Sequence, residues 1–223
     1  MDPLRTEEDQ IQALKRWWSE NGVSTVLSVV VAVSAVLGWR SWQAQQEAKA
    51  EAAAYAYQNL QQAVALAAQA PDDIKIAEAL HAADTIKEEF SNTGYALFAA
   101  LAKAKQAVAD KDYDTAASEL RWVMDKTDST ELREIASLRL ARVLLSVGDL
   151  DAALAEITQT GEIAAGGDVF AAQKAELAGD IYVERGAYQQ AFEQYKLAET
   201  IASEGAQRLP LLAVKMSYAK SHL

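Results

Sequence analysis

The chain has 223 residues, a net charge of −11 and no cysteine. Without cysteine it forms neither disulfides nor thiolate metal sites, and its acidic balance argues against nucleic acid as a partner, because phosphate binding needs a basic surface. Half of the residues are hydrophobic, yet the mean hydropathy is only −0.10, so the apolar residues are concentrated in part of the chain.

The apolar residues gather near the N-terminus. No charged residue occurs from Asn21 to Trp39, and Arg40 closes this run. As a helix, the stretch from Trp18 to Trp39 would be about 31 Å long, close to the hydrocarbon thickness of a bilayer. Tryptophan favours the membrane interface. We therefore predict a short segment over residues 1–20 and a transmembrane helix over residues 21–42, with Trp17, Trp18, Trp39, Arg40 and Trp42 at the interfaces.

Two other interpretations of this run remain open, a cleaved signal peptide and a buried helix of a soluble protein. Val33-Ser34-Ala35 has the small residues of a cleavage site, but this site lies inside the run and is followed by bulky tryptophans. We favour the uncleaved anchor. One more basic residue lies before the run than shortly after it, a slight indication that the N-terminus is cytoplasmic.

Small side chains recur within the predicted span at intervals of four, four and three residues. On a helix they form one stripe, along which a second transmembrane helix could approach closely. The alternative is that serine and alanine are simply tolerated there. The stripe consists of Ser24, Ser28, Ala32 and Ala35.

The remainder, residues 43–223, is predicted to be one helical domain. It holds 27 acidic residues against 17 Lys and Arg, and helix-forming residues dominate it. The first helix is expected over residues 43–69, either continuing the membrane helix or breaking after Trp42. A second helix is expected to start at Pro71 and to run to about Phe90, because proline and acidic residues favour a first turn.

After Gly94 the sequence repeats itself in three stretches: ALFAALAKAKQAVADKDYDTAASEL, ASLRLARVLLSVGDLDAALAEI and AELAGDIYVERGAYQQAFEQY. Alignment of Lys111, Gly148 and Gly186 gives periods of 37 and 38 residues. Such periods are typical of helical hairpins, which must stack because one unit cannot bury its own apolar face. The predicted fold class is all-α, a single N-terminal transmembrane helix followed by an α-solenoid.

The repeats resemble tetratricopeptide repeats. The third is clearest, and the first departs from the pattern, with Lys111 at the turn and Ala104 at the small site. The periods exceed the family's usual length, so we expect lengthened connections, notably from Gly161 to Gly167. The third repeat has small, aromatic and turn residues at the family's positions: Gly179, Tyr182, Gly186, Ala191, Tyr195 and Ala198.

Taken end to end, the chain resembles a narrower family, the YfgM-type ancillary subunits of the bacterial Sec (SecYEG) translocon. The resemblance covers nearly the whole chain and rests on the order and spacing of short motifs. These are ALKRWWSENG (13–22), GWRSW (38–42), AYQN (56–59), NTGYAL (92–97) and LRLARV (138–143).

The resemblance implies a single-pass protein of the bacterial inner membrane, with a cytoplasmic N-terminus and a periplasmic repeat domain. It implies association with the Sec translocon and with a membrane-anchored periplasmic chaperone of prolyl-isomerase type, and transfer of exported client proteins to periplasmic chaperones. It also links the N-terminus to restraint of a cytoplasmic envelope-stress response regulator. Composition alone indicates none of this.

No recognisable motif of catalysis, cofactor or metal binding is present, so we expect neither an enzyme nor a cofactor. The two histidines, His81 and His222, lie outside any motif of nucleophilic catalysis. Three aspartates from Asp110 to Asp114 imitate the start of a calcium loop, but the glycine and glutamate that such a loop needs are missing. A polar turn between two helices is the better interpretation.

Binding is therefore expected on the concave face of the solenoid, which the first helix of each hairpin lines. Apolar side chains there would supply affinity, and Lys105 and Arg142 would fix the register of a partner. Two alternatives stay open: these apolar residues belong to the core, or the C-terminal segment from Leu209 covers the groove. The predicted groove residues are Phe98, Leu101, Lys105 and Val108; Ile135, Leu138, Arg142 and Leu145; and Gln173, Glu176, Asp180 and Val183.

The predicted function is that of a membrane-tethered adaptor that binds partner proteins near the export channel. Tethering raises the effective concentration of the binding site, so modest affinities suffice. The alternative is a purely structural scaffold subunit of an inner-membrane complex that never contacts exported proteins.

Overall fold

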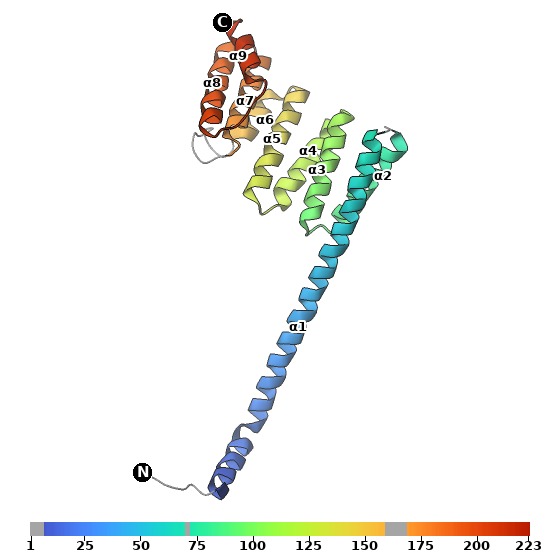
Figure 1. Ribbon diagram of the computed structural model, residues 1–223, viewed down its shortest axis with the longest axis vertical. Coiled ribbons are helices and arrows are strands. Elements are labelled where there is room, and N and C mark those ends of the chain that lie inside the picture. Colours follow the sequence, from blue (N-terminus) through green and yellow to red (C-terminus); the bar gives the residue numbers. More distant parts are fainter. Residues whose placement is uncertain (1–6, 70–71, 159–168) are drawn as a thin grey trace, which may run out of the picture. The chain divides into compact units, whose positions relative to one another are not determined.

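The computed structural model describes residues 7–69, 72–158 and 169–223, and within these ranges the chain forms nine α-helices and no strand (Figure 1). The all-α prediction is confirmed. The chain divides after Ala52 into two compact units. Helix α1 (Glu7–Gln69) belongs to both and continues through Trp42 without a break, so the helix expected over residues 43–69 continues the apolar one.

The first unit contains the apolar part of α1. By its length and composition this helix could cross a membrane, and its apolar side chains from Val23 to Trp42 are mostly exposed. The hydroxyl groups of Thr25 and Ser28 donate to the carbonyls of Asn21 and Ser24, four residues earlier, over 2.9 and 2.8 Å. These polar groups are satisfied within the helix, as a lipid environment requires.

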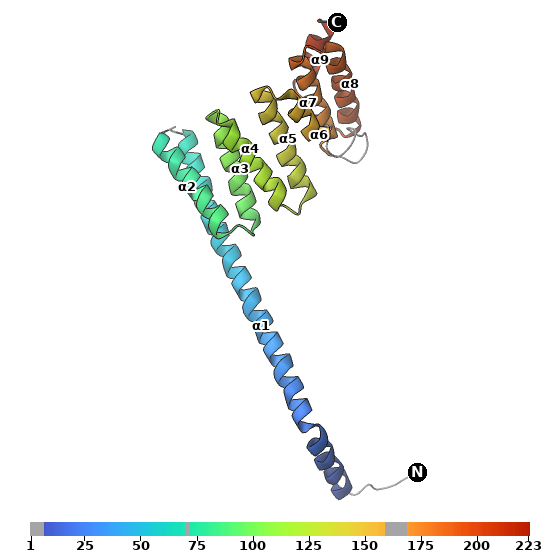
Figure 2. The ribbon, with the colours of Figure 1, turned by 180° about the vertical axis from the view of Figure 1, so that it is seen from behind.

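The second unit, from Ala53 to Leu223, is built of helical hairpins. The end of α1 is followed by α2 (Asp73–Glu89), and three further pairs follow it. Both views show these pairs stacked in chain order (Figures 1 and 2). The pairs are α3 (Gly94–Ala109) with α4 (Tyr113–Lys126), α5 (Thr130–Val147) with α6 (Leu150–Thr158), and α7 (Ala171–Glu184) with α8 (Tyr188–Glu204), and α9 (Leu212–Lys220) ends the stack.

The three aligned turn positions have the same backbone geometry. Lys111, Gly148 and Gly186 all have left-handed φ angles, of 60°, 82° and 71°. This conformation lets each first helix end and the chain reverse into the second helix. Glycine adopts it freely, whereas a lysine is strained by its Cβ atom. The alignment that defines the periods of 37 and 38 residues is therefore structurally correct.

Aspartate side chains start the second helices α4 and α6, through Asp112 and Asp149. Asp112 accepts a hydrogen bond from the backbone N–H of Thr115 over 3.1 Å and so caps α4. Hydrogen bonding from the side chain of Thr115, and then from its backbone N–H, lowers the pKa of the Asp112 carboxyl group. The aspartates from Asp110 to Asp114 thus belong to a polar turn and helix cap, as the sequence indicated. The connection from Gly161 to Gly167 lies outside the described residues.

The core is unusually rich in alanine. Ala116, Ala153 and Ala191 occupy the same position in the three hairpins and are fully buried. Large residues one turn later, Leu120, Ile157 and Tyr195, are at most 2% exposed. A small side chain brings two helices close together, and the large one then fills the space towards the neighbouring hairpin.

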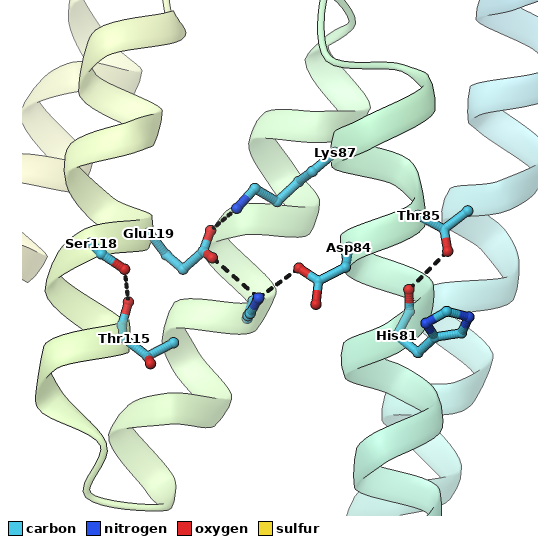
Figure 3. Close-up of polar contacts among 8 residues, drawn as sticks. His81, Asp84, Thr85, Lys87, Thr115, Ser118 and Glu119 are labelled. Carbon is cyan, nitrogen blue, oxygen red and sulfur yellow. Dashed lines mark hydrogen bonds and ion pairs between the residues drawn. The ribbon is translucent and has the colours of Figure 1, made fainter.

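A buried carboxylate joins the first two hairpins. Glu119 on α4 is only 6% exposed and accepts ion-pair contacts from Lys87 on α2 and, over 3.4 Å, from Lys103 on α3. Figure 3 shows the Glu119 carboxylate beside the Lys87 amine. The amine of Lys103 also donates a hydrogen bond to Asp84, over 2.5 Å. The Lys87 amine also lies 4.9 Å from the ring centroid of Trp122. This network fixes the packing of three helices.

Candidate binding groove

An open groove of about 680 Å³ lies along the first helices of the first two repeats. Most of its lining comes from α3 and α5, and Tyr57 from the end of α1 also lines it. The remaining surface is mostly apolar. The lining residues are Tyr57, Phe98, Leu101, Ala102, Ala104, Lys105, Val108, Leu120, Leu132, Ile135, Arg139, Arg142, Val143 and Ser146.

The first predicted row of groove residues lies where the tetratricopeptide register puts it. Phe98, Leu101, Lys105 and Val108 all line the groove from α3. Phe98 and Val108 are 46% and 41% exposed, which is unusual for side chains of this size in a helical core. A large part of both side chains is therefore available on the surface.

Only part of the second predicted row lines this groove. Ile135 and Arg142 line the groove, but Leu138 is 5% exposed and belongs to the core, so the prediction that it points into the groove is wrong. Arg139 takes its place on the groove wall. Leu145 lines a separate hollow of about 470 Å³ towards α7 and α9. The reason is helical geometry. On α5 the residues that line the groove after Ile135 follow at spacings of four and then three residues, whereas the predicted row has spacings of three and then four.

None of the third row lines this groove. Glu176 and Asp180 on α7 instead accept hydrogen bonds from the amine of Lys215 on α9, over 2.8 and 2.7 Å. Val183 lies with Leu145 in the separate hollow, and Gln173 is half-buried. The C-terminal helix therefore covers the third hairpin, whereas it contributes no residue to the groove of the first two.

A polar network extends from α9 into the last hairpin. The hydroxyl of Tyr195 donates to the other carboxylate oxygen of Asp180 over 2.8 Å. Burial raises the pKa of Tyr195, and the hydrogen bond to Asp180 raises it further. Burial by itself lowers the pKa of Lys215, but its hydrogen bonds to Asp180 and Glu176 outweigh this, and the pKa is raised.

Aromatic rings gather at the α1 side of the groove. The ring of Tyr57 lies 5.6 Å from that of Tyr95 and 6.0 Å from that of Phe98, between centroids. Sequence reasoning missed Tyr57, because α1 precedes the repeats that define the register. The motif AYQN, in which Tyr57 occurs, was the available signal.

Three cations stand on the groove walls. Lys105, Arg139 and Arg142 are exposed, and within the described part of the chain their side chains form no ion pair. None of the described lining residues is acidic. An apolar surface flanked by unpaired cations can hold a partner that carries both apolar and acidic groups.

The predicted membrane residues lie on the first unit. The tryptophan pairs are exposed, with centroids 6.4 Å apart for Trp17 and Trp18 and 5.2 Å for Trp39 and Trp42. Trp18 lies against Gly22, whose Cβ, if present, would be 3.2 Å from the indole ring. Arg40 is also exposed, as are the residues of the small stripe, Ser24, Ser28, Ala32 and Ala35.

Residues 7–69, 72–158 and 169–223 offer no group of three histidine, aspartate or glutamate side chains placed to hold a metal ion. His81 is exposed on α2, and its backbone carbonyl accepts a hydrogen bond from the Thr85 hydroxyl (Figure 3). His222 stacks on Tyr188, with ring centroids 4.7 Å apart. The groove is the candidate binding site of the second unit.

Comparisons with known proteins agree with this architecture. A family model described as a tetratricopeptide repeat-like domain matches residues 15–220. No solved structure matches the chain at a significant level. Three curated relatives carry the name ancillary SecYEG translocon subunit.

The three relatives match over most of their length. The protein from Haemophilus influenzae is 32% identical over 91% of this chain and 93% of its own. The protein from Escherichia coli K12 is 34% identical over 83% of this chain and 84% of its own. The protein from Aggregatibacter actinomycetemcomitans is 33% identical over 95% of this chain and 96% of its own. The chain therefore belongs to the family of tetratricopeptide repeat-like ancillary SecYEG translocon subunits.

Proposed function

We propose that this protein is a membrane-tethered adaptor of the Sec translocon that binds partner proteins in the groove between α3 and α5. The observation that carries the proposal is the open apolar groove itself, which the fold leaves uncovered while α9 covers the last hairpin. The names of the relatives supply the translocon as the place of action. The apolar helix α1 supplies the tether.

Topology is the first element of the proposal. Residues 1–20 lie in the cytoplasm, residues 21–42 cross the inner membrane, and residues 43–223 form the periplasmic repeat domain. The absence of cysteine allows a clean test with single introduced cysteines. A membrane-impermeant maleimide added to spheroplasts should label Ser203→Cys and should label Gln12→Cys only after lysis. Labelling in the opposite order would overturn the proposed orientation.

Client contact is the second element. The groove receives segments of exported proteins or of a membrane-anchored prolyl-isomerase-type chaperone, and helps pass exported chains to periplasmic chaperones. Confinement beside the channel raises the effective concentration of the groove, so a weak individual affinity is sufficient. The N-terminal segment has a further proposed role, restraint of a cytoplasmic envelope-stress response regulator.

Photo-crosslinking during export tests client contact. A photoreactive residue at Leu101 or Val108 in the groove should crosslink to exported chains and to translocon or chaperone subunits. The same residue at Ser118, exposed on α4 and absent from the groove, is the control. Crosslinks from the groove to subunits alone would support the alternative, a scaffold that does not contact clients. No crosslink from the groove at all would refute the proposed function.

A further inference from the structure

The groove has a charge opposite to that of the chain. The whole chain has a net charge of −11, whereas the charged residues that line the groove are Lys105, Arg139 and Arg142. Like charges across an interface are costly, and opposite charges accelerate association. The groove is therefore matched to a partner that is locally acidic.

The fold does not use these three cations. Elsewhere in the second unit, lysines near the core are ion-paired: Lys87 and Lys103 with Glu119, Lys174 with Glu134, and Lys215 with two carboxylates. The groove cations have no such partner in the described ranges, and they flank an apolar surface formed by Leu101, Val108 and Ile135. They are free to meet charges on another molecule.

The lining favours a helix over an extended segment. An extended segment must find partners for its backbone N–H and C=O groups, and the described lining offers only Tyr57 and Ser146 as neutral polar side chains. A helix satisfies its backbone internally and presents only side chains. From Phe98 to Val108 the α3 wall extends over about 15 Å, or about three helical turns of a partner.

The chain itself shows how a helix docks on a first helix of this domain. Leu212 and Ala219 of α9 are buried against the last hairpin, and Lys215 meets the carboxylates of Glu176 and Asp180 on α7. Apolar anchors thus combine with one charge opposite to that of the receiving helix. On α5 the receiving charges are positive, so the corresponding partner charges are negative.

We propose that the groove binds an acidic amphipathic helix of a partner protein. Its apolar residues lie on Leu101, Val108 and Ile135, and its carboxylates meet Arg139 and Arg142. This inference rests on the proposed function and specifies the chemistry of the segment that the groove selects.

The test uses the full-length protein in nanodiscs of zwitterionic lipid and three designed peptides of about 14 residues, enough to cover the α3 wall. The first is helical, with leucine along one stripe and glutamate on the flanks. The second replaces each glutamate by lysine, and the third scrambles the order of the first. Binding is measured by fluorescence anisotropy at low and high salt.

We expect the acidic peptide to bind best, with an affinity that falls as salt rises. The double variant Arg139→Glu/Arg142→Glu should weaken its binding at least about tenfold and improve that of the lysine peptide. The control variant Arg121→Glu/Arg208→Glu changes the net charge equally at exposed sites outside the groove and should have little effect. Arg139→Gln/Arg142→Gln provides a second variant should the reversal disturb folding.

Several results would overturn the inference: equal or stronger binding of the lysine peptide, binding that ignores the arginine substitutions, or binding of none of the peptides. Capture of phosphatidylglycerol vesicles through Arg139 and Arg142 without peptide binding would instead assign the groove to a lipid surface. Self-association that depends on these arginines would assign it to a second copy. If groove crosslinks to exported chains persist while the peptides fail, the inference falls and the proposed function stands.

Discussion

A Cβ atom added to Gly179 would lie 2.3 Å from Cε1 of Tyr195. Tyr195 is 2% exposed and bonded to Asp180, so its ring cannot move aside. We expect Gly179→Ala to reduce the free energy of unfolding by about 1–3 kcal/mol, the usual cost of overpacking a core. Chemical denaturation of the full-length protein in detergent measures this change.

Gly94→Ala is the matched control, because a Cβ there meets no atom within 4 Å. Its effect should stay within about 0.5 kcal/mol. In the background of Tyr195→Leu, Gly179→Ala should be less harmful, since the clash has been removed, and a double-mutant cycle would report the coupling. If Gly179→Ala lowered the free energy of unfolding equally in both backgrounds, the Tyr195 ring would not be the group that excludes a side chain at residue 179.

The left-handed turns predict opposite effects of opposite substitutions. Lys111→Gly should stabilise the protein by about 1 kcal/mol, because it relieves the strain of a Cβ at a φ of 60°. Gly148→Ala and Gly186→Ala should destabilise it by a similar amount, and for the same reason. Neither glycine has a neighbour within 4 Å of the added Cβ, so backbone strain alone is measured. The measurement is the Tm of each variant. A shift of Tm in the same direction in all three variants would contradict this interpretation.

The network of Tyr195, Asp180 and Lys215 predicts a loss of stability at alkaline pH. The ordinary pKa values are 10.0 for tyrosine and 10.5 for lysine, and both are raised in the folded protein. Above about pH 10 the folded state therefore holds more protons than the unfolded state, and the free energy of unfolding falls as pH rises. Below about pH 9 both groups are protonated in the folded and the unfolded state, so they contribute no pH dependence there.

Tyr195→Phe and Lys215→Met should each flatten this alkaline decline, as measured by urea unfolding between pH 8 and about pH 12. Lys220→Met, on the exposed end of the same helix, serves as the control. Declines of the same steepness in the wild type and in both variants would mean that other groups control alkaline unfolding.

Glu119 predicts two different outcomes, depending on how much of its network is removed. Glu119→Gln leaves Lys87 and Lys103 without the carboxylate between them and should cost about 3 kcal/mol. Replacing the three charges together, as Lys87→Met/Lys103→Met/Glu119→Leu, should cost far less, because the buried charges are all removed. Asp84 then loses its ion pair with Lys103, but its side chain is 41% exposed, so water can solvate it. If the triple variant proved the less stable of the two, the ion pairs would be stabilising in their own right.

Much of the fold could be predicted because the helical signals are local. The alignment of the repeats placed Lys111, Gly148 and Gly186 at equivalent turns, and all three have left-handed backbone geometry. The four residues of α3 that the register predicts for the groove line the pocket beside α5. On α5 the stripe passes through Arg139 rather than Leu138, and the polar character of Arg139 beside Arg142 was the overlooked signal.

The rest depends on tertiary contacts that periodicity does not contain. Glu176 and Asp180 fit the register of a groove but are engaged by Lys215, which lies 35 residues or more further along the chain. Tyr57 enters the groove from a helix outside the repeats. A repeat pattern predicts which face of the stack a residue occupies. The helices that flank the repeats, α1 and α9, decide which part of that face stays open.

The apolar run of α1 predicts a membrane span that charge should destroy. Val29 and Val33 lie one turn apart near its centre and are 56% and 51% exposed. An arginine at the centre of a transmembrane helix costs about 3 kcal/mol, so Val29→Arg/Val33→Arg should strongly reduce insertion. The measurement is the fraction of protein that stays in the membrane pellet after alkaline extraction. Gln43→Arg/Gln46→Arg, beyond the run on the same helix, should leave this fraction unchanged, and a wild-type protein that is itself extracted would contradict the span.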